Sequence, residues 1–414
     1  MRVLMFGWEF PPYQAGGLAT ATVGLVKGLI GEGVDVTLVV PFPVDHSPIG
    51  GLRLIGADHV PSDRLVVHRI ETPLEPYATA ARYQEVYARA RPASGAKRPI
   101  YGRDLLAEVD RYTALAGAIA QREPHDLIDA HDWITFGAGI AAREASGRPL
   151  IAHLHATEYD RTGGPGNAAI LERERQGLRA ADRVICNSHR LATQCAERFA
   201  VSPESIDVVH WGIDREPSPE PEAEVASGLG PDTPVVLFLG RVTSQKGPDY
   251  FIEMAGRVAR YQPRARFVVA GNGDMLPGLM ERAAELGIAD RVIFTGGLGP
   301  REVQRVFRLA DVCVMPSRNE PFGLVALESL LQGTPCILPR DAGVSEVVQN
   351  AFKIDCWDVE AMTDRVVALL KHRSLRRELS ERGRAELDLP RFTLAEAARR
   401  TAASYRTLIE RAHA

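Results

Sequence analysis

One segment of the sequence combines two carboxylates, a glycine and the expected start of a helix. The apolar run Val312–Met315 predicts a strand, and the polar loop after it leads into a helix that begins near Phe322 or Gly323. Free backbone N–H groups at a helix start attract phosphate. Glu320 lies in the loop, and Glu328 lies about two turns along the helix. The pattern predicts a phosphate or sugar site, although a capped surface helix with a solvated carboxylate would have the same sequence.

A second loop places two cations between glycines at the end of an expected strand. The run Val235–Leu239 predicts this strand, and Gly240–Gly247 (GRVTSQKG) follows it directly. Arg241 and Lys246 would bring two positive charges to a diphosphate. The order Lys-Gly differs from the Gly-Lys-Ser/Thr order of a Walker A loop, so the segment is not a P-loop. A surface loop with two solvated cations is the alternative interpretation.

A pair of glycines lies between the first expected strand and the first expected helix. Gly16 and Gly17 are part of the segment Gln14–Leu18 (QAGGL). Adjacent glycines allow an anion or a sugar to approach the backbone closely. A tight turn that requires positive φ explains the same pair equally well.

A histidine beside an aspartate comes just past another expected strand, Asp126–Asp129. His131 and Asp132 could form a general-base pair, although such a histidine is more often structural. His153 and His155 form a His-x-His pair that could bind a metal ion. No third ligand lies at a convincing spacing and no Asp-x-Asp sequence occurs, so we expect no metal site.

The elements that must position these side chains alternate between apolar runs and amphipathic stretches. Strand–helix alternation predicts parallel sheets with helices on both faces. Further strands are expected at Arg2–Phe6, Val34–Pro41, Pro149–His153, Arg183–Asn187, Arg266–Ala270, Arg291–Thr295 and Pro335–Leu338. Ligands of such sheets bind outside the carboxyl ends of the strands.

The alternation pauses once, at residues 214–234, which are rich in Pro, Glu, Gly and Ser and predict a linker. We therefore expect an α/β chain with two Rossmann-like, doubly wound parallel-sheet domains that face a cleft. The N-terminal domain is expected at residues 1–213 and the C-terminal domain at residues 235–392. A final helix at residues 393–412 has no following strand, and we expect it to pack back on the N-terminal domain.

The composition limits the kinds of partner and compartment. The chain has 414 residues, and its 49 Lys and Arg against 53 Asp and Glu give a net charge of −4. This balance does not indicate a nucleic-acid partner or a polybasic membrane surface. The five cysteines are irregularly spaced without a C-x-x-C pair, which favours a reduced, cytoplasmic setting.

Together these segments resemble the retaining glycosyltransferases of the GT-B type, specifically family 4 and its glycogen and starch synthase relatives. The resemblance covers nearly the full chain and includes order and spacing as well as residue type. It rests on Trp8–Pro12 with Gly16–Leu18, on His131–Trp133, on Gly240–Arg241 with Lys246–Gly247, on Glu320–Gly323 with Glu328, and on Glu346.

The resemblance implies a donor, an acceptor and a set of site residues. The C-terminal domain would bind a nucleoside diphosphate sugar, with UDP- or ADP-glucose expected, and the N-terminal domain would face a saccharide acceptor such as an α-glucan. Transfer would retain the anomeric configuration and would need neither a metal ion nor another cofactor. The implied catalytic residues are His131, Arg241, Lys246 and Glu320. The implied donor-binding residues are Gly16, Gly17, Gly323, Leu324, Val325 and Glu328.

Individual roles also follow from the resemblance. Arg241 and Lys246 would neutralise the diphosphate as it leaves, and two cations with a helix dipole are suited to that task. Glu328 would hold the ribose hydroxyls, and Glu320 would contact the hydroxyls of the donor sugar. His131 would lie beside the anomeric carbon of that sugar or its 6-hydroxyl.

Two residues differ from the synthase pattern. Gln14 replaces a lysine, and Trp211 replaces an asparagine; Trp211 could stack on a sugar, but we expect it to pack. Tyrosines and arginines in Tyr77–Arg103 leave open a lipid or cell-surface glycan acceptor with peripheral membrane contact. A catalytically silent protein that binds nucleotide sugars is the third alternative.

Overall fold

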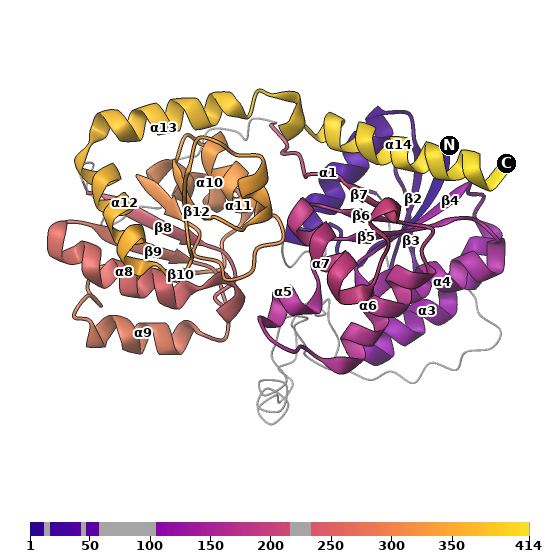
Figure 1. The fold of residues 1–414 in the computed structure, drawn as a ribbon, viewed down its shortest axis with the longest axis horizontal. Coiled ribbons are helices and arrows are strands. Elements are labelled where there is room, and N and C mark those ends of the chain that lie inside the picture. Colours follow the sequence, from indigo (N-terminus) through magenta and orange to yellow (C-terminus); the bar gives the residue numbers. More distant parts are fainter. Residues whose placement is uncertain (12–16, 43–46, 58–104, 216–232, 414) are drawn as a thin grey trace. The chain divides into compact units, whose positions relative to one another are not determined.

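A computed structural model of the chain describes residues 1–11, 17–42, 47–57, 105–215 and 233–413. These residues form two compact units (Figure 1). Unit 1 comprises Met1–Gly212 and Leu394–Ala414, and unit 2 comprises Ile213–Thr393. Gly16, the segment Tyr77–Arg103 and residues 216–232 of the predicted linker lie outside the described residues.

Unit 1 is built around a seven-stranded sheet with the order β3-β2-β1-β4-β5-β6-β7, in which all neighbouring strands are parallel. Its strands are β1 (Arg2–Phe6), β2 (Asp35–Val40), β3 (Arg53–Gly56), β4 (Leu127–His131), β5 (Leu150–Leu154), β6 (Arg183–Cys186) and β7 (Ile206–Val208). Strands β4 and β5 are buried at every residue because helices cover both faces of the sheet. The strand order reverses between β1 and β4, and such a reversal creates a crevice at the carboxyl ends of the strands.

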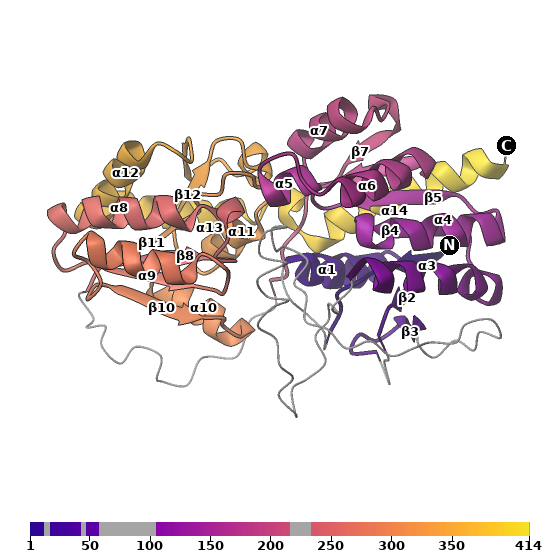
Figure 2. The same ribbon diagram turned by 90° about the horizontal axis from the view of Figure 1, so that it is seen from below.

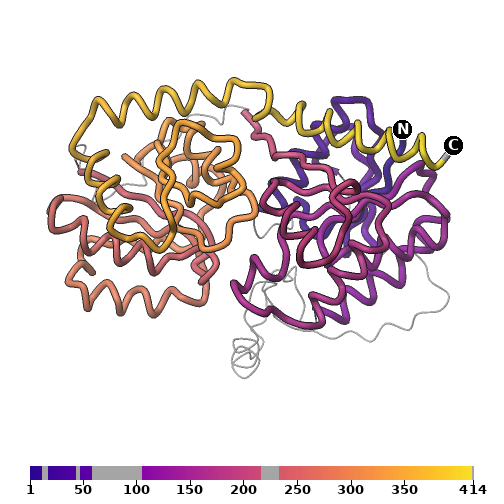
Figure 3. Tube along the Cα trace, viewed as in Figure 1, coloured from indigo at the N-terminus to yellow at the C-terminus, as the bar shows by residue number. Residues whose placement is uncertain are grey.

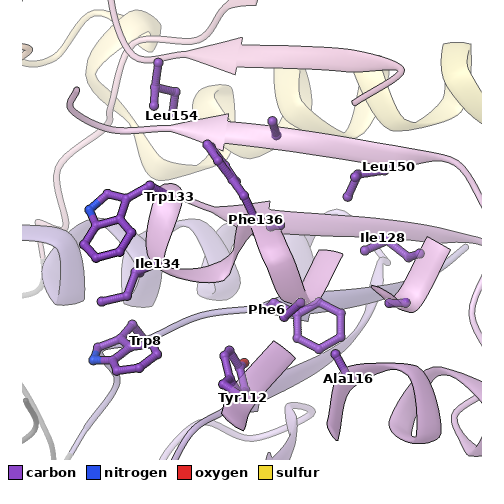
Figure 4. Close-up of a cluster of buried hydrophobic side chains, with 14 of the residues drawn as sticks. Phe6, Trp8, Tyr112, Ala116, Ile128, Trp133, Ile134, Phe136, Leu150 and Leu154 are labelled. Atoms are coloured by element: carbon purple, nitrogen blue, oxygen red, sulfur yellow. The ribbon is translucent and has the colours of Figure 1, made fainter. Parts of the chain in front are cut away.

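Helices pack on both faces of this sheet (Figure 2). Helices α3, α4 and α7 bury one face in a cluster that includes Phe6, Tyr112 and Phe136 (Figure 4). Helices α1 and α14 bury the other face against residues such as Val3 and Met5. The helices of unit 1 are α1 (Gly17–Gly31), α3 (Leu105–Arg122), α4 (Trp133–Ser146), α5 (Glu158–Thr162), α6 (Ala168–Ala180), α7 (His189–Phe199), the 3-10 turn Pro203–Ser205 and α14 (Leu394–His413).

The C-terminal helix α14 lies in direct contact with α1 (Figure 3). A Cβ atom on Gly24 would come within 2.8 Å of Leu394 Cδ2, and one on Gly28 would come within 2.7 Å of Ala398 Cβ. Glycines on α1 therefore allow the two helices to approach closely. The chain returns to unit 1 at its end, where α14 completes the hydrophobic core.

Unit 2 contains a six-stranded parallel sheet with the order β10-β9-β8-β11-β12-β13, which reverses between β8 and β11. Its strands are β8 (Val235–Leu239), β9 (Arg266–Ala270), β10 (Val292–Gly296), β11 (Val312–Val314), β12 (Cys336–Pro339) and β13 (Phe352–Ile354). Its helices are α8 (Pro248–Tyr261), α9 (Leu276–Glu285), α10 (Pro300–Leu309), α11 (Leu324–Leu331), α12 (Val359–Lys371), α13 (Arg373–Glu386) and the 3-10 turns Ser244–Lys246, Gly343–Glu346 and Pro390–Phe392. Helices α8, α9 and α12 bury one face of the sheet, and α10 and α11 pack against β8 and β12. The two sheets confirm the predicted pair of Rossmann-like, parallel α/β folds.

A close backbone contact in unit 2 provides a test of this fold. Gly271 follows β9 with φ 140°, and a Cβ atom there would lie 1.9 Å from the carbonyl oxygen of Gly240, next to β8. We expect Gly271→Ala to lower the free energy of unfolding of unit 2 by about 3 kcal/mol. Gly278→Ala in α9 is the matched control, because a Cβ atom there has no neighbour within 4 Å. Urea unfolding of both variants measures the difference, and equal stabilities would contradict the contact.

Candidate functional site

The loops after β8 and β11 meet where the strand order of unit 2 reverses. Lys246, from the first loop, places its Nζ 2.6 Å from Oε2 of Glu320, from the second loop. Ser317 Oγ donates a hydrogen bond of 3.0 Å to the same carboxylate oxygen. Glu320 is only 6% exposed, so its charge is held by these two partners rather than by bulk water. The structure thus brings two sequence-predicted residues, 74 positions apart, into contact.

Gln245 ties the same two loops together. Its Oε1 accepts a hydrogen bond of 2.8 Å from Arg241 Nη2, and its Nε2 donates one of 3.0 Å to the carbonyl oxygen of Asn319. The backbone carbonyl of Gln245 also accepts the N–H of Arg318 at 2.8 Å. Buried side chains that bridge two loops fix the positions of the charged groups beside them. Sequence reasoning missed Gln245 and Ser317, although both lie inside the segments that it selected.

Gly323 shapes the start of helix α11. Its φ of 113° lies in the region that favours glycine, and a Cβ atom would come within 2.8 Å of Met315 Cε and 3.2 Å of Glu320 Cγ. Helix α11 begins at Leu324, and no side chain caps it. The first N–H groups of a helix have no partner within the helix, so those of Leu324 and Val325 can bind an anion. This edge of unit 2 therefore offers two cations, one carboxylate and a helix N-terminus.

Glu328 lies farther along α11 and is partly buried. Burial raises the pKa of its carboxyl group to about 7. The group is therefore poised between its neutral and ionised forms near neutral pH. A ligand that donates hydrogen bonds to the carboxylate would favour the ionised form.

In unit 1, His131 is the last residue of β4 and is 1% exposed. The sequence pattern suggested Asp132 as its partner, and this interpretation is wrong. Residues two apart in a strand share a face, so Asp129 faces His131, with 3.3 Å between Asp129 Oδ2 and His131 Nε2. The same oxygen lies 3.4 Å from Nδ1 of His153 on the neighbouring strand β5.

Asp132 instead binds groups in and near the loop after β5. Its backbone φ is 61°, an uncommon value for a residue with a side chain. Its Oδ1 accepts the backbone N–H groups of His155 and Ala156 at 2.7 and 3.4 Å, and its Oδ2 lies 3.3 Å from Arg161. Asp132 thus holds the loop after β5 in place beside the carboxyl end of β4.

Three imidazole rings stack beneath this edge of unit 1. The ring centroids of His131, His153 and His155 are 4.6 to 5.0 Å apart, and Trp211 packs 5.3 Å from His155. Among the described residues of this unit, Asp129, His131 and His153 bring three potential metal-ligand atoms within 4.8 Å of one another. A metal ion shared by two imidazoles must lie in both ring planes, whereas the rings of His131 and His153 are stacked at 23°. The geometry fits a hydrogen-bonded carboxylate better than a metal site.

The predicted site residues divide between the units. Arg241, Lys246, Glu320, Gly323, Leu324, Val325 and Glu328 belong to unit 2, and His131 and Gly17 belong to unit 1. Gly17 is the exposed first residue of α1, and a Cβ atom there would meet nothing within 4 Å. The start of α1 is therefore open to a ligand.

Two family models match the chain. The model described as "Glycosyl transferases group 1" matches residues 220–386, and the model described as "Glycosyltransferase Family 4" matches residues 15–217. Each match therefore corresponds largely to one of the two sheets. Of the helices that the structure describes, none combines the length and apolar character needed to cross a membrane.

Similar proteins include glycosyltransferases of known and unknown specificity. An uncharacterized glycosyltransferase of Methanocaldococcus jannaschii is 28% identical over 84% of this chain and 83% of its own length. A D-inositol 3-phosphate glycosyltransferase of Thermobispora bispora is 32% identical over 71% of this chain and 74% of its own length. The D-inositol 3-phosphate glycosyltransferase of Segniliparus rotundus is 31% identical over 69% of this chain and 67% of its own length.

Solved structures have the same fold at low identity. Sucrose-phosphate synthase from Thermosynechococcus elongatus superposes with a TM-score of 0.74, 21% identity and coverage of 99% of both chains. Anabaena HepE, in complex with UDP and glucose, superposes with a TM-score of 0.69, 17% identity and coverage of 98% of this chain and 100% of its own. These similarities identify the two-sheet architecture as the GT-B fold.

Proposed function

The chain belongs to the glycosyltransferases of the GT-B fold, and from this premise we propose that it transfers a hexose from a nucleoside diphosphate sugar to a saccharide acceptor. The proposed sugar is glucose, and UDP or ADP is the proposed nucleotide. The contact between Lys246 and Glu320 beside the start of α11 carries the proposal. It brings a cation of the kind that suits a phosphate and a carboxylate of the kind that suits sugar hydroxyls to one edge of one sheet.

The proposed chemistry follows from the charges at this edge. As the glycosidic bond breaks, negative charge develops on the leaving diphosphate. Arg241, Lys246 and the N–H groups at the start of α11 are preorganised to stabilise that charge. Glu320 orients a sugar hydroxyl and fixes the position of Lys246. We propose that the acceptor attacks on the face from which the diphosphate leaves, so that the anomeric configuration is retained without a protein nucleophile or a metal ion.

Three acceptors are proposed, in order. The first is a small phosphorylated polyol or sugar, because relatives that are 31–32% identical are named D-inositol 3-phosphate glycosyltransferases. The second is an α-glucan, which the resemblance to glycogen synthases favours. Gln14 and Trp211, which differ from the synthase pattern, weigh against the glucan. A lipid or cell-surface acceptor remains the third proposal.

The test is a matrix of donors and acceptors. UDP- and ADP-linked glucose, galactose and N-acetylglucosamine are each combined with myo-inositol 3-phosphate, glucose 6-phosphate or maltooligosaccharides, with and without EDTA. Release of nucleoside diphosphate together with a new glycoside, unchanged by EDTA, is the expected result. Donor binding without release in any combination would support the silent binding protein and contradict the transferase.

The raised pKa of Glu328 predicts a pH-dependent donor affinity. If its carboxylate accepts hydrogen bonds from ribose hydroxyls, only the ionised form binds well. With a pKa of about 7, the ionised fraction rises about tenfold between pH 6 and pH 8, so the Kd for the donor should fall about tenfold over that range. Calorimetric titration with UDP measures this change.

Matched variants isolate the carboxylate. Glu328→Gln should bind the nucleotide with little pH dependence and with the weak affinity that the wild type has at pH 6. Glu281→Gln on the exposed surface of α9 should behave like the wild type. If Glu328→Gln keeps the full pH dependence, Glu328 is not the group that titrates.

A further inference from the structure

The turn between β4 and α4 in unit 1 consists of one residue, Asp132. Strand β4 ends at His131 and helix α4 begins at Trp133, so Asp132 alone carries the change of chain direction. Trp133 and Ile134 are buried in a core cluster of this unit, which fixes the start of α4 (Figure 4). Strand β4 is one of the two strands between which the order of the sheet reverses. The turn therefore borders the crevice in which ligands of such sheets bind.

The backbone of Asp132 is strained. Its φ of 61° and ψ of 168° lie in a region that essentially only glycine adopts readily, because a residue with a Cβ atom is strained there. Backbone hydrogen bonds hold this conformation: the N–H of Asp132 donates to the His153 carbonyl at 2.9 Å, and its carbonyl accepts the N–H groups of Thr135 and Phe136 at 3.0 and 3.2 Å. Such strain persists only where the surrounding structure opposes its release, and it is concentrated at functional sites.

Arg161 of α5 braces the side chain of this strained residue. Its own side chain is only 5% exposed. Its Nη2 donates to Asp132 Oδ2 at 3.3 Å and to the carbonyl oxygen of Ala156, in the loop after β5, at 2.9 Å. The other oxygen of Asp132 accepts N–H groups of the same loop. One guanidinium thus joins the turn after β4 to the loop after β5.

The charges around Arg161 favour its contact with Asp132. Two other carboxyl groups lie nearby, with Oε1 of Glu174 at 3.1 Å and Oε2 of Glu158 at 3.9 Å from Arg161 Nη1. Burial raises the pKa of both groups, and it raises that of Glu174 to about 8, so Glu174 is mainly neutral at neutral pH. Burial also raises the pKa of Asp132, and Arg161 opposes that rise more than any other group does. Arg161 is therefore the main partner of the Asp132 carboxylate.

We propose that Arg161 is a positioning residue for sugar transfer. By holding Asp132, it keeps the strained turn and the carboxyl ends of β4 and β5 in the arrangement that the crevice of unit 1 requires. Arg161 acts on the substrate only through these segments, because its guanidinium is buried against its protein partners. The inference rests on the proposed function for the reaction, whereas the strain and its support belong to the fold alone.

Two substitutions of Asp132 test the strain without any substrate. Asp132→Ala and Asp132→Gly both remove the carboxylate, but only glycine adopts the observed φ and ψ without strain. We expect Asp132→Gly to melt at a higher temperature than Asp132→Ala, which is the reverse of the usual order of these two residues. Equal melting temperatures, or a more stable alanine variant, would overturn the strained turn.

Kinetics test the role of Arg161. We expect Arg161→Met to lower kcat/KM for the acceptor about 30-fold, because a small displacement of a crevice wall costs much of the rate. The Kd for UDP, whose proposed site lies in unit 2, should change less than about twofold. Arg175→Met is the matched control and should behave like the wild type, because Arg175 pairs with Glu172 within the same surface helix, α6. Equal losses in the two variants, or a wild-type rate in Arg161→Met, would overturn the role.

A double variant shows whether Arg161 acts through Asp132. When it is added to Asp132→Ala, Arg161→Met should lower kcat/KM by less than about threefold more, because the side chain that it holds is already gone. Losses that multiply would overturn the route through Asp132. All rates are measured at a temperature at which thermal melting shows each compared variant to be folded.

Two further outcomes complete the test. If Arg161→Met does not fold, the two Asp132 variants decide the role by rate: Asp132→Gly should exceed Asp132→Ala about tenfold in kcat/KM, and equal rates would overturn the inference. If the wild type transfers no sugar with any donor and acceptor, the proposed function fails, while the melting temperatures of the two Asp132 variants still decide the strained turn.

Discussion

Replacing Lys246 with alanine is expected to lower kcat for sugar transfer by about 100- to 1,000-fold. The substitution removes a cation that is held 2.6 Å from Glu320 and leaves that nearly buried carboxylate without its counter-ion. Negative charge on the departing diphosphate would then lose a preorganised partner. Because that charge is greatest in the transition state, kcat should fall more than the donor KM rises. Steady-state release of nucleoside diphosphate measures both constants.

Two variants separate charge from packing at this position. Lys246→Arg keeps the positive charge and should retain activity within about tenfold of the wild type, because a guanidinium differs from an ammonium in shape and reach. Lys371→Ala removes an exposed lysine at the end of α12 and should have no effect. If Lys246→Ala transfers sugar at the wild-type rate, the cation has no part in catalysis.

Replacing Glu320 with glutamine is expected to lower kcat by about 100-fold. The glutamine keeps the size of the side chain, but it loses the charge that pairs with Lys246 and that accepts the Ser317 hydroxyl. We expect the glutamine to weaken the proposed contact with the donor sugar and to leave Lys246 less firmly positioned. Glu378→Gln on α13 is the control, because Glu378 is exposed and pairs with Arg382 on the same helix.

The double variant shows whether the two residues act as a unit. Lys246→Ala combined with Glu320→Gln should lose about as much activity as the more damaged single variant, because each single change already breaks the pair. Losses that multiply would mean that the two side chains act independently. If the protein only binds nucleotide sugars, the wild type itself will show no sugar transfer.

Hydrophobic pattern predicted the central strands well. The expected bounds of β1, β8 and β9 agree with the structure, because each strand contains a run of four or five apolar residues that are nearly all buried. Strands β3, β7 and β13 were missed, and each lies at the edge of its sheet. They are only three or four residues long and largely half-buried, so their sequences lack the apolar run that marks a central strand.

The candidate site was predictable in its parts but not in its contacts. The loops that contain Lys246 and Glu320 could be selected from glycines and charges at strand ends. Their contact depends on β8 and β11 being neighbours, which follows from strand order and not from local sequence. The hydrogen bond that Tyr405 donates to Asp129 is even harder to predict, because the two residues are 276 positions apart in the sequence. A single sequence holds no local signal for such a pair.

The proposed reaction is retaining transfer of a hexose from a nucleoside diphosphate sugar. Proton NMR of the reaction between UDP-α-glucose, ADP-α-glucose or the other donors and the panel of acceptors tests it most directly, because one spectrum follows both donor loss and the new anomeric proton. The expected result is an α-linked product that appears at the rate at which the nucleoside diphosphate is released. A β-linked product would contradict retention, and a donor that stays intact with every acceptor would contradict transfer itself.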